Sequence, residues 1–570
     1  MRRRSAIAAL FAVPLCAALL VGASAAGAPT SAKASAVTPA GTWGKAKEVP
    51  GTATLNAGGD AQVESLSCSS PGNCSAGGFY EDSSDEAQAF IVNETGGTWG
   101  KAEEVPGTAT LNAGGDAKVK SLSCGSSGNC SAGGYYTDVS GEEQAFVVNE
   151  TGGTWGEAEE VPGTRLLNSG YAGVESLSCS SLGDCSAGGN FEDSLNHFQA
   201  FVVNETGGTW GEAEEVPGTA TLNAGGDAEV YSLSCSSPGN CSAGGYYTDG
   251  SSHIQAFVEN ETSGAWGDAE EVPGTAALNA GGDAEIESLS CSSTGNCSAG
   301  GFYEDASLHT QAFLINETGG TWGEAEEVPG TATLNADGYA GVETLSCSSS
   351  SNCSAGGFYE DAFDHTQALV VNETGGTWGK AEEVPGTAAL NAGGDADIES
   401  LSCSSSGNCS AGGFYETASL YGQAFVVNET SGKWGEAEEV PGTATLNAGG
   451  DADIESLSSS SSDNCSAGGF YEDASGHEQA FVVIYFPRPT VVKLSPNKGP
   501  ASGRTTVTIT GTNLLGATAV HFGTALAKIG KVVSATELKV TSPKGRGTVA
   551  VTVTTPGGTS AKTKADRYTY

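Results

Sequence analysis

The sequence predicts an all-β protein, in which an eight-bladed β-propeller of four-stranded blades is followed by an immunoglobulin-like β-sandwich. Three observations lead to this fold class. A repeat of about 56 residues fills residues 41–487, each repeat holds four short strand-like segments, and a region of different composition follows at residues 488–570. The 84 glycines and the single methionine argue against long helices.

Eight tryptophans mark the repeat, at intervals of 56 residues with a single interval of 55: Trp43, Trp99, Trp155, Trp210, Trp266, Trp322, Trp378 and Trp434. In the unit that begins at Ala61, four segments rich in β-branched and aromatic residues are separated by turn-forming sequences. We expect strands at residues 63–68, 74–81, 88–94 and 98–105. Four antiparallel strands in a unit of this length are typical of a propeller blade.

The two ends of the repeat array are complementary. The last unit stops after its third strand, "QAFVVIYFP", whereas residues 41–49 supply a strand of the fourth type ahead of the first unit. If the N-terminal strand completes the last blade, the ring closes and no strand edge stays exposed. We therefore predict a closed ring at residues 41–487, with an open stack or two smaller assemblies as alternatives.

The segment "NETGGTW" at residues 93–99 returns in most later blades. It resembles the Asp-box (BNR-type) turn of sialidase-like propellers, although the defining aspartate is out of register. The repeat "SLSCxSxGNCSAGG" is also similar to that of secreted actinobacterial repeat proteins. Both resemblances imply a propeller blade and imply little about chemistry.

Fourteen cysteines form seven pairs, each with five residues between the partners and each flanking the turn between the first two strands. Partners in such a hairpin can face each other, and an oxidising compartment lets them form disulfides. The predicted disulfides are Cys68–Cys74, Cys124–Cys130, Cys179–Cys185, Cys235–Cys241, Cys291–Cys297, Cys347–Cys353 and Cys403–Cys409. Because Ser459 takes the first cysteine position of the eighth unit, we expect Cys465 to carry a thiol. Zinc is disfavoured, because two thiolates make half a site.

Residues 1–25 have the three parts of a secretory signal: three arginines, an apolar run at residues 6–21 and a small-residue cleavage site. We expect this signal to be removed and residues 26–40 to form a flexible segment. We also expect no transmembrane segment. The protein is therefore predicted to be secreted, with non-covalent cell-wall association as an option.

Charge is unevenly distributed along the chain. Residues 488–570 hold 12 basic and two acidic side chains, a net charge of +10, whereas residues 36–487 hold eight basic and 66 acidic ones, a net charge of −58. Solubility is the simplest interpretation of the acidic body. Binding of cations such as calcium, or docking of the basic region onto the body, are the alternatives.

The basic region contains "SPNKGPASG", "VTITGTNL", "VHFG" and "TVAVTVTTPGGTS". Over residues 488–570 it resembles an IPT/TIG domain, which implies an Ig-like (E-set) fold used in extracellular contacts. We expect strands at residues 505–511, 519–523, 537–543, 548–555 and 566–570, after a linker at residues 485–489. The secretory signal disfavours a nucleic-acid partner. The positive charge instead predicts an anionic cell-wall polymer or the acidic propeller as partner.

The loops between second and third strands vary most among the repeats, and we expect them to share one face with the long "PGTATLNAGGDA" connections. Variable loops on a constant scaffold suit recognition, and neutral drift is the equal alternative. Candidate ligand-face residues are Asp82, His197, His253, His309, His365 and His477. A metal site is disfavoured because each blade supplies a single histidine. No cofactor is expected, and calcium at Asp60 or Asp116 is the weaker alternative.

Eight near-identical blades repeat the same groups, whereas an active site needs several unlike groups at one place. The repeat region holds a single arginine, Arg165, whereas the sialidases that the blades resemble grip their substrate with an arginine cluster. We therefore predict a monomeric, non-enzymatic binding protein. Its propeller face recognises a carbohydrate or protein at the cell surface, and its C-terminal domain is a spacer or anchor. The alternatives are a secreted glycan-active enzyme and a purely structural envelope protein.

Overall fold

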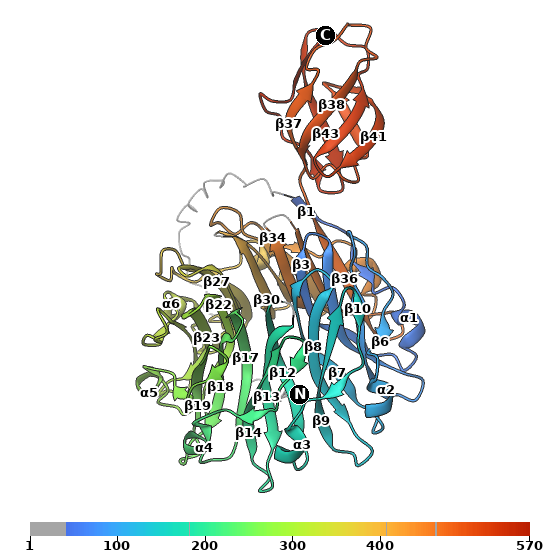
Figure 1. The fold of residues 1–570 in the computed structure, drawn as a ribbon. Helices are drawn as coiled ribbons and strands as arrows, with labels where there is room; N and C mark the ends of the chain where they lie inside the picture. The colour runs from blue at the N-terminus through green and yellow to red at the C-terminus, as the bar shows by residue number, and fades with distance from the viewer. Residues whose placement is uncertain (1–40, 182, 406, 462–463) are drawn as a thin grey trace, which may run out of the picture. The chain divides into compact units, whose positions relative to one another are not determined.

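The computed structural model describes residues 41–181, 183–405, 407–461 and 464–570. The predicted signal peptide (residues 1–25) and the segment at residues 26–40 lie outside them. Eight antiparallel sheets of four or five strands form the blades of a propeller, and two further sheets form the C-terminal domain (Figure 1). The predicted fold class is confirmed.

Each blade starts with its innermost strand, and the next two strands pair outward in order. The first strands of blades one to eight are β3 (Ala61–Ser70), β7 (Ala117–Ser126), β12 (Ala172–Ser181), β17 (Ala228–Ser237), β22 (Ala284–Ser293), β26 (Ala340–Ser349), β30 (Ala396–Ser405) and β34 (Ala452–Ser461). The second strands are β4 (Asn73–Glu81), β8 (Asn129–Thr137), β13 (Asp184–Glu192), β18 (Asn240–Thr248), β23 (Asn296–Glu304), β27 (Asn352–Glu360), β31 (Asn408–Glu416) and β35 (Asn464–Glu472). The third strands are β5 (Ala87–Asn93), β9 (Glu143–Thr151), β14 (Phe198–Thr206), β19 (Ile254–Thr262), β24 (Thr310–Asn316), β28 (Thr366–Asn372), β32 (Gly422–Asn428) and β36 (Glu478–Pro487).

The fourth strand is interrupted, which differs from the continuous strand expected at residues 98–105. The tryptophan pairs first, as β1 (Gly41–Trp43), β10 (Thr154–Trp155), β15 (Thr209–Trp210), β20 (Ala265–Trp266) or as a single bridge such as Glu94–Trp99. The chain then bends toward the preceding blade, where the N–H of Ala102 donates to the carbonyl of Pro50 at 2.7 Å. A second piece returns to the sheet as β2 (Lys47–Glu48), β6 (Glu103–Glu104), β11 (Glu159–Glu160), β16 (Glu214–Glu215), β21 (Glu270–Glu271), β25 (Glu326–Glu327), β29 (Glu382–Glu383) or β33 (Glu438–Glu439).

One-turn helices occupy the long connections, where the sequence analysis expected loops. They are α1 (Thr52–Leu55), α2 (Thr108–Leu111), α3 (Thr164–Leu167), α4 (Thr219–Leu222), α5 (Thr275–Leu278), α6 (Thr331–Leu334), α7 (Thr387–Leu390) and α8 (Thr443–Leu446). Each follows a glycine in the left-handed region, such as Gly51 with φ 102°. The buried hydroxyl of Thr52 donates to the carbonyl of Val49 at 2.8 Å, which secures the turn.

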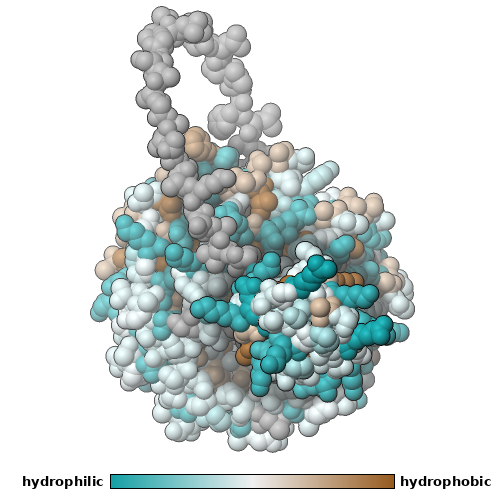
Figure 2. Space-filling model, turned by 90° about the horizontal axis from the view of Figure 1, so that it is seen from above, coloured by the Kyte–Doolittle hydropathy of each residue, from teal (hydrophilic) through white to brown (hydrophobic). Residues whose placement is uncertain are grey.

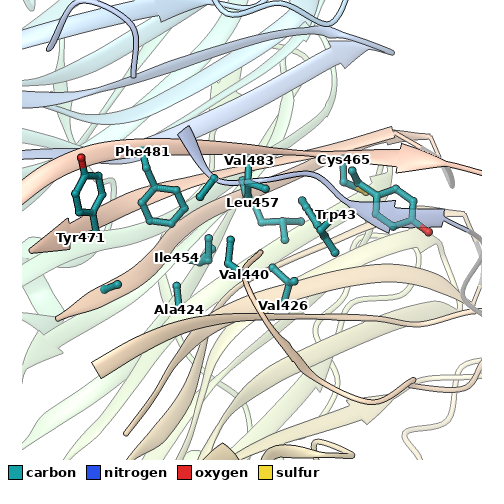
Figure 3. Close-up of a cluster of buried hydrophobic side chains, with 14 residues drawn as sticks. Trp43, Ala424, Val426, Val440, Ile454, Leu457, Cys465, Tyr471, Phe481 and Val483 are labelled. Atoms are coloured by element: carbon teal, nitrogen blue, oxygen red, sulfur yellow. The ribbon is translucent and has the colours of Figure 1, made fainter. Parts of the chain in front are cut away.

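The N-terminal strand closes the ring. β1 pairs antiparallel with β36, with Trp43 opposite Tyr485, and β2 pairs with the same strand. The Trp43 ring meets the Tyr485 ring edge-on at 5.4 Å between centroids, within the apolar cluster between blades seven and eight (Figure 3). The predicted closure is confirmed. Residues 485–487 extend β36 to make this pairing, so the linker predicted from residue 485 begins later.

Eight apolar clusters join the blades, one at each interface. Adjacent glycines in each second strand permit this close approach. A Cβ on Gly77 would lie 2.7 Å from Cγ1 of Val119 in the next blade, and a Cβ on Gly78 would lie 1.9 Å from the carbonyl oxygen of Gln62. The "SAGG" segment is therefore required by packing on both of its sides.

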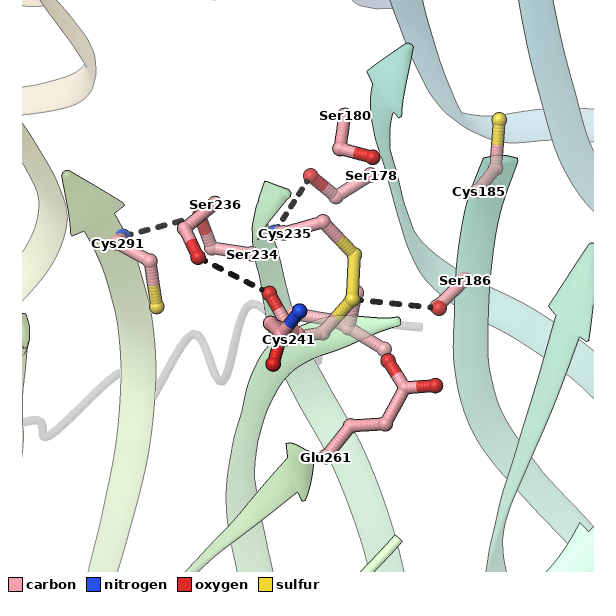
Figure 4. Close-up of a disulfide and its surroundings, with 12 residues drawn as sticks. Ser178, Ser180, Cys185, Ser186, Ser234, Cys235, Ser236, Cys241, Glu261 and Cys291 are labelled. Carbon is pink, nitrogen blue, oxygen red and sulfur yellow. Dashed lines mark hydrogen bonds between the residues drawn. A yellow bond between two sulfur atoms is a disulfide. The ribbon is translucent and has the colours of Figure 1, made fainter. Parts of the chain in front are cut away.

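Serine hydroxyls join the inner edges of the blades. The first strand lies at the edge of its sheet, so alternate N–H groups point away from its partner strand. The N–H groups of Leu289 and Cys291 donate to Oγ of Ser232 and Ser234 in the preceding blade, at 2.8 and 3.0 Å. Figure 4 shows the Ser234 bond beside the equivalent one from Cys235 to Ser178.

Two such bonds, 2.8–3.1 Å long, recur at every one of the eight interfaces, with Thr344 replacing serine once. The interface between blades eight and one is included, so these bonds run around the whole ring.

All seven predicted cysteine pairs form disulfides, each with 4.0 Å between Cα atoms. Cys235–Cys241, in Figure 4, lies beside Ser186 of the preceding blade, whose Oγ is 3.3 Å from the sulfur of Cys241. In blade eight, Ser459 occupies the same register opposite Cys465. Cys465 is buried and lies outside the disulfides.

Glu259 breaks the symmetry of the apolar interfaces. It lies on β19, where the other blades carry valine or isoleucine, and its side chain is 2% exposed. Neither of its carboxyl oxygens has a hydrogen-bond partner among the described residues. Burial, followed by the nearby Glu214 and Glu261, raises the pKa of Glu259 well above its usual value of 4.5.

The C-terminal domain is a two-sheet sandwich around one apolar core. Its strands are β37 (Thr490–Ser495), β38 (Thr506–Thr512), β39 (Ala519–Phe522), β40 (Ala525–Leu526), β41 (Lys528–Ser534), β42 (Glu537–Thr541), β43 (Thr548–Thr555), β44 (Gly558–Thr559) and β45 (Arg567–Thr569). Five of these were expected. Four were not expected: β37, which lies between prolines, β41, whose apolar pattern is interrupted by a bulge at Gly530, and the two-residue strands β40 and β44.

We predict that removing the inner hydroxyls at one interface destabilises the ring. Ser288→Ala with Ser290→Ala leaves the N–H groups of Leu345 and Cys347 without acceptors, so the free energy of unfolding should fall by about 1–3 kcal/mol. The matched control is Ser292→Ala with Ser293→Ala on the same strand, whose hydroxyls bond within their own turn. Denaturant unfolding measures both, and equal losses would contradict the role of the inner hydroxyls.

We predict that Ser459→Cys forms an eighth disulfide with Cys465, because the two positions share the register of the other seven pairs. The short loop should raise the free energy of unfolding by about 2 kcal/mol. Thiol titration of the unfolded, unreduced protein should lose one equivalent relative to the parent. An unchanged thiol count would show that this hairpin differs from the others.

We predict that Glu259→Val stabilises the propeller, and more so at higher pH. Below its usual pKa of 4.5 the carboxyl is neutral in both states. As pH rises, the unfolded chain ionises while the folded protein holds the group neutral, so the parent loses stability until the raised pKa is passed. The gain should exceed about 2 kcal/mol near pH 8 and be smaller near pH 4. Glu259→Gln should remove the pH dependence that this carboxyl causes, while a buried polar group remains. An equal gain in stability from Glu259→Val at both pH values would contradict the raised pKa of Glu259.

Candidate functional site

The propeller presents two different sets of turns. On one face, which we call the loop face, the turns between second and third strands meet the helical connections, as where the N–H of Gly58 donates to the carbonyl of Glu81 at 2.9 Å. On the other, the cysteine face, the cysteine turns of blades one to seven meet the turns that follow the third strands, as where the N–H of Gly97 donates to the carbonyl of Gly72 at 2.9 Å. The structure thus groups the loops as the sequence predicted.

The aspartates of the variable loops hold their own turns. Oδ1 of Asp249 accepts the N–H groups of Ser251 and His253 at 2.7 and 3.0 Å, and Oδ2 accepts from the side chain of Gln255 at 3.4 Å. The bond from the backbone N–H of His253 lowers the pKa of Asp249. Asp82 accepts in the same way from the N–H of Ser84 at 2.7 Å. These carboxylates are therefore occupied within the loop.

The five candidate histidines pack at blade interfaces. His253 is half exposed, its Nδ1 lies 3.8 Å from Oδ2 of Asp249, and its ring covers Gly282 of the next blade, where an added Cβ would lie 2.8 Å from Cδ2. His197, His309, His365 and His477 cover Gly226, Gly338, Gly394 and Gly59 in the same way. The structure brings no two of these histidines together. Among the described residues, no group of three or more His, Cys, Asp or Glu side chains is placed to hold a metal ion.

Apolar side chains project from the tips of the same loops. Val139, Leu195, Leu308, Phe363 and Leu420, from five different blades, are 67–86% exposed. Their loops are otherwise polar, and they are not among the candidates predicted from the sequence, which are titratable groups. The sequence does contain a signal that could have identified them. Each of these loops includes a large apolar residue, which turn formation does not require.

A buried hydrogen-bond network repeats on the cysteine face. Asn93 accepts from the hydroxyl of Ser75 at 2.9 Å and from the indole of Trp155 in the next blade at 3.1 Å, and it donates to Glu150 of that blade at 2.5 Å. The turn that resembles an Asp box therefore serves to connect blades. Burial raises the pKa of these glutamates, for example of Glu205 to about 7.

Two polar crevices lie between blades on the cysteine face. One of about 290 Å³ lies between blades six and seven and is lined by Asn372, Glu373 and Glu429 among others. The other, of about 90 Å³, lies between blades two and three beside Glu150 and Glu205. One carboxyl oxygen of each of these four glutamates has no partner among the described residues. The crevices can therefore accept small hydrogen-bond donors, water included.

The innermost strands carry many of the acidic groups. One equivalent position holds Glu64, Lys120, Glu175, Tyr231, Glu287, Glu343, Glu399 and Glu455 in blades one to eight. Lys120 forms an ion pair with Glu64 of the neighbouring blade. Of the calcium candidates, Asp60 has its pKa raised to about 7, by burial and then by Glu478. Burial also raises the pKa of Asp116.

Solved structures similar to this chain include three that show the range of coverage. A protein of unknown function from Dyadobacter fermentans is 13% identical, with a TM-score of 0.32 over 53% of this chain and 91% of its own. A subtype N11 neuraminidase-like protein of A/flat-faced bat/Peru/033/2010 (H18N11) is 12% identical, with a TM-score of 0.29 over 53% and 84%. Hadza microbial sialidase Hz136 is 11% identical, with a TM-score of 0.28 over 70% and 72%. These scores are too low to support any inference about activity.

Curated protein sequences gave no significant match to this chain. In the part of the chain that the structure describes, no helix is long and apolar enough to cross a membrane. A family model does match the C-terminal region: residues 489–570 match the IPT/TIG domain. The sandwich of β37 to β45 is therefore an IPT/TIG domain.

Proposed function

We propose that the protein is a secreted or envelope-associated binding protein, whose loop face recognises its ligand and whose TIG domain is a spacer or anchor. The observation that carries the proposal is the set of apolar loop tips. Five blades each expose a large apolar side chain on the same face. An aspartate fixes the loop internally in four of them, and Thr417 does so in the fifth. The recurrence of such a side chain in the loops of five blades favours a binding role for this face, because loops on a rigid scaffold commonly carry binding residues.

Binding, rather than catalysis, fits the arrangement of the polar groups. The candidate aspartates are occupied by their own backbone, and the candidate histidines cover glycines of the next blade. The groups on the loop face that remain available are apolar tips and surface carboxylates. Among cell-surface ligands these favour a protein over a carbohydrate, because apolar side chains contribute most where they enter apolar pockets of a partner.

The predicted secretory signal and the seven disulfides support an extracellular location, since disulfides persist in oxidising compartments. The net charge of +10 on residues 488–570 supports the anchor role, because the surrounding envelope polymers that it would contact are anionic.

We predict that the loop-tip variant Leu195→Ser, Leu308→Ser, Phe363→Ser and Leu420→Ser loses at least about tenfold in affinity for the ligand. The matched control replaces four exposed threonines of the cysteine face, Thr98, Thr209, Thr321 and Thr377, with alanine, and it should bind like the parent. The full chain is screened against a glycan array and against purified cell-surface proteins at low and physiological salt.

The outcomes separate the function classes. Binding that is lost with the loop tips and that persists at physiological salt supports recognition by the loop face. Binding that survives in the loop-tip variant places the ligand elsewhere and overturns the proposal. Turnover of a bound glycan would make the protein an enzyme, and silence on every surface would make it structural.

A further inference from the structure

Four basic side chains gather in two neighbouring loops of the TIG domain. Lys498 and Arg504 belong to the loop at residues 496–505, and Lys544 and Arg546 to the loop at residues 542–547. All four are exposed, and neither loop contains an acidic residue. We call these two loops the basic tip. Figure 2 looks onto this end of the domain, where long hydrophilic side chains surround small ones.

Backbone hydrogen bonds hold the two loops of the basic tip together. The N–H of Arg504 donates to the carbonyl of Ser542 at 2.8 Å, and the N–H of Gly545 donates to the carbonyl of Ala501 at 3.1 Å. The N–H of Thr505 also donates to the hydroxyl of Ser542 at 3.1 Å. The loops approach so closely that a Cβ on Gly503 would lie 2.4 Å from the carbonyl oxygen of Pro543. The four cations are thus presented from a fixed backbone.

Arg504 has φ 69°, in the left-handed region that a residue with a Cβ adopts at a cost. The next loop residue back, Gly503, already supplies the positive φ (73°) that a tight turn needs. The turn therefore holds Arg504 in a conformation that a residue with a Cβ adopts at a cost.

The two acids of the domain are engaged away from the basic tip. Glu537 lies 3.4 Å from Lys539, and Asp566, which is buried, lies 3.9 Å from Arg567 and accepts the N–H of Thr563 at 2.7 Å. In the described part of the chain, no ion pair joins Lys498, Arg504, Lys544 or Arg546 to a carboxylate. Their charge is therefore available to a ligand.

We propose that the basic tip binds the phosphate groups of a phosphodiester polymer. Arginine and phosphate match, because the planar guanidinium donates two parallel hydrogen bonds to two phosphate oxygens. A polymer fits better than a free phosphate or a single headgroup, because one phosphodiester carries one negative charge and four cations lie together here. The inference deepens the proposed anchor role, on which it rests.

The domain offers a matched control surface. The outer side of the sheet β37-β38-β42-β41 carries Lys493, Lys528, Lys531 and Lys539 among threonines, with Lys531 directly opposite Lys539 in the register. This sheet surface has the same number of positive charges as the basic tip, and Glu537 lies beside them. If net charge alone attracts the polymer, both surfaces should contribute equally.

The test measures binding of the full chain to poly(glycerol phosphate) at about 0.05 and 0.15 M salt, where the Debye length shortens from about 14 to 8 Å. The tip variant carries Lys498→Gln, Arg504→Gln, Lys544→Gln and Arg546→Gln. The sheet variant carries the same change at Lys493, Lys528, Lys531 and Lys539. We expect the tip variant to lose at least about tenfold in affinity and to flatten the salt dependence. The sheet variant should lose less than about threefold.

A third variant, Gly503→Ala, tests the geometry without changing the charge. Its new Cβ meets backbone atoms of Pro543 and Lys544, so it should separate the loops and weaken binding several-fold. Thermal unfolding confirms that each variant is folded. If Gly503→Ala does not fold, the tip variant still tests the inference, because it changes only surface side chains.

Each remaining outcome has a defined meaning. Equal losses in the tip and sheet variants would overturn the inference and leave the anchor role intact, since charge alone would then explain binding. If the parent chain does not bind the polymer, both the phosphate-binding inference and the anchor role are overturned. The same binding measurement is made with three other ligands, namely phosphatidylglycerol vesicles, inorganic phosphate and polygalacturonate. Tighter binding to any of these than to poly(glycerol phosphate) would reject a phosphodiester polymer as the ligand.

Discussion

The propeller depends on one repeated interaction, the hydrogen bond from an inner-strand N–H group to a serine hydroxyl of the preceding blade. An inner strand has a free edge, and eight such edges meet around the ring with no further strand to cover them. The two hydroxyls of the "SLS" segment, "TLS" in blade six, supply the missing acceptors, while the leucine between them points into the apolar cluster. The same three letters therefore satisfy the backbone and pack the interface. At the closing interface, Ser456 and Ser458 accept from Leu66 and Cys68, across 390 residues of sequence.

Two departures from the repeat lie in blade eight, where the ring is closed by a separate strand. Ile484 replaces the asparagine of the cysteine-face network, and among the described residues the indole of Trp99 in blade one has no acceptor. Ser459 replaces a cysteine of the disulfide in the same blade. These losses are tolerated because the seam keeps its other contacts, namely the pairing of β1 with β36, the Trp43 cluster and the inner serines. Stability that is spread over many equivalent contacts makes single losses small.

The features predicted from the sequence were those that depend on neighbours along the chain. Strand segments, turns and cysteine pairs lie within one hairpin, so their spacing alone identifies them. Several of the features that were missed depend on the neighbouring blade. Nothing local shows that His253 covers Gly282, or that Ser234 accepts from Cys291. Glu259 is a single acidic residue in an apolar strand, and its burial becomes evident only from the blade interface that surrounds it. The apolar loop tips stand out once exposure is known.

The charge of the two domains restricts what each can bind. A phosphodiester polymer of the kind proposed for the basic TIG domain would be repelled by a propeller of net charge −58, so we expect a propeller ligand to be neutral or cationic on its contact surface. The exposed apolar tips meet the same requirement, since they add contact area that does not depend on charge. Raised salt should then weaken the two interactions unequally, because it screens the TIG contacts and leaves apolar contacts largely unchanged. One chain with two surfaces of this kind can link an anionic polymer to a partner that does not itself bind polyanions, and this role requires no catalytic group on either domain.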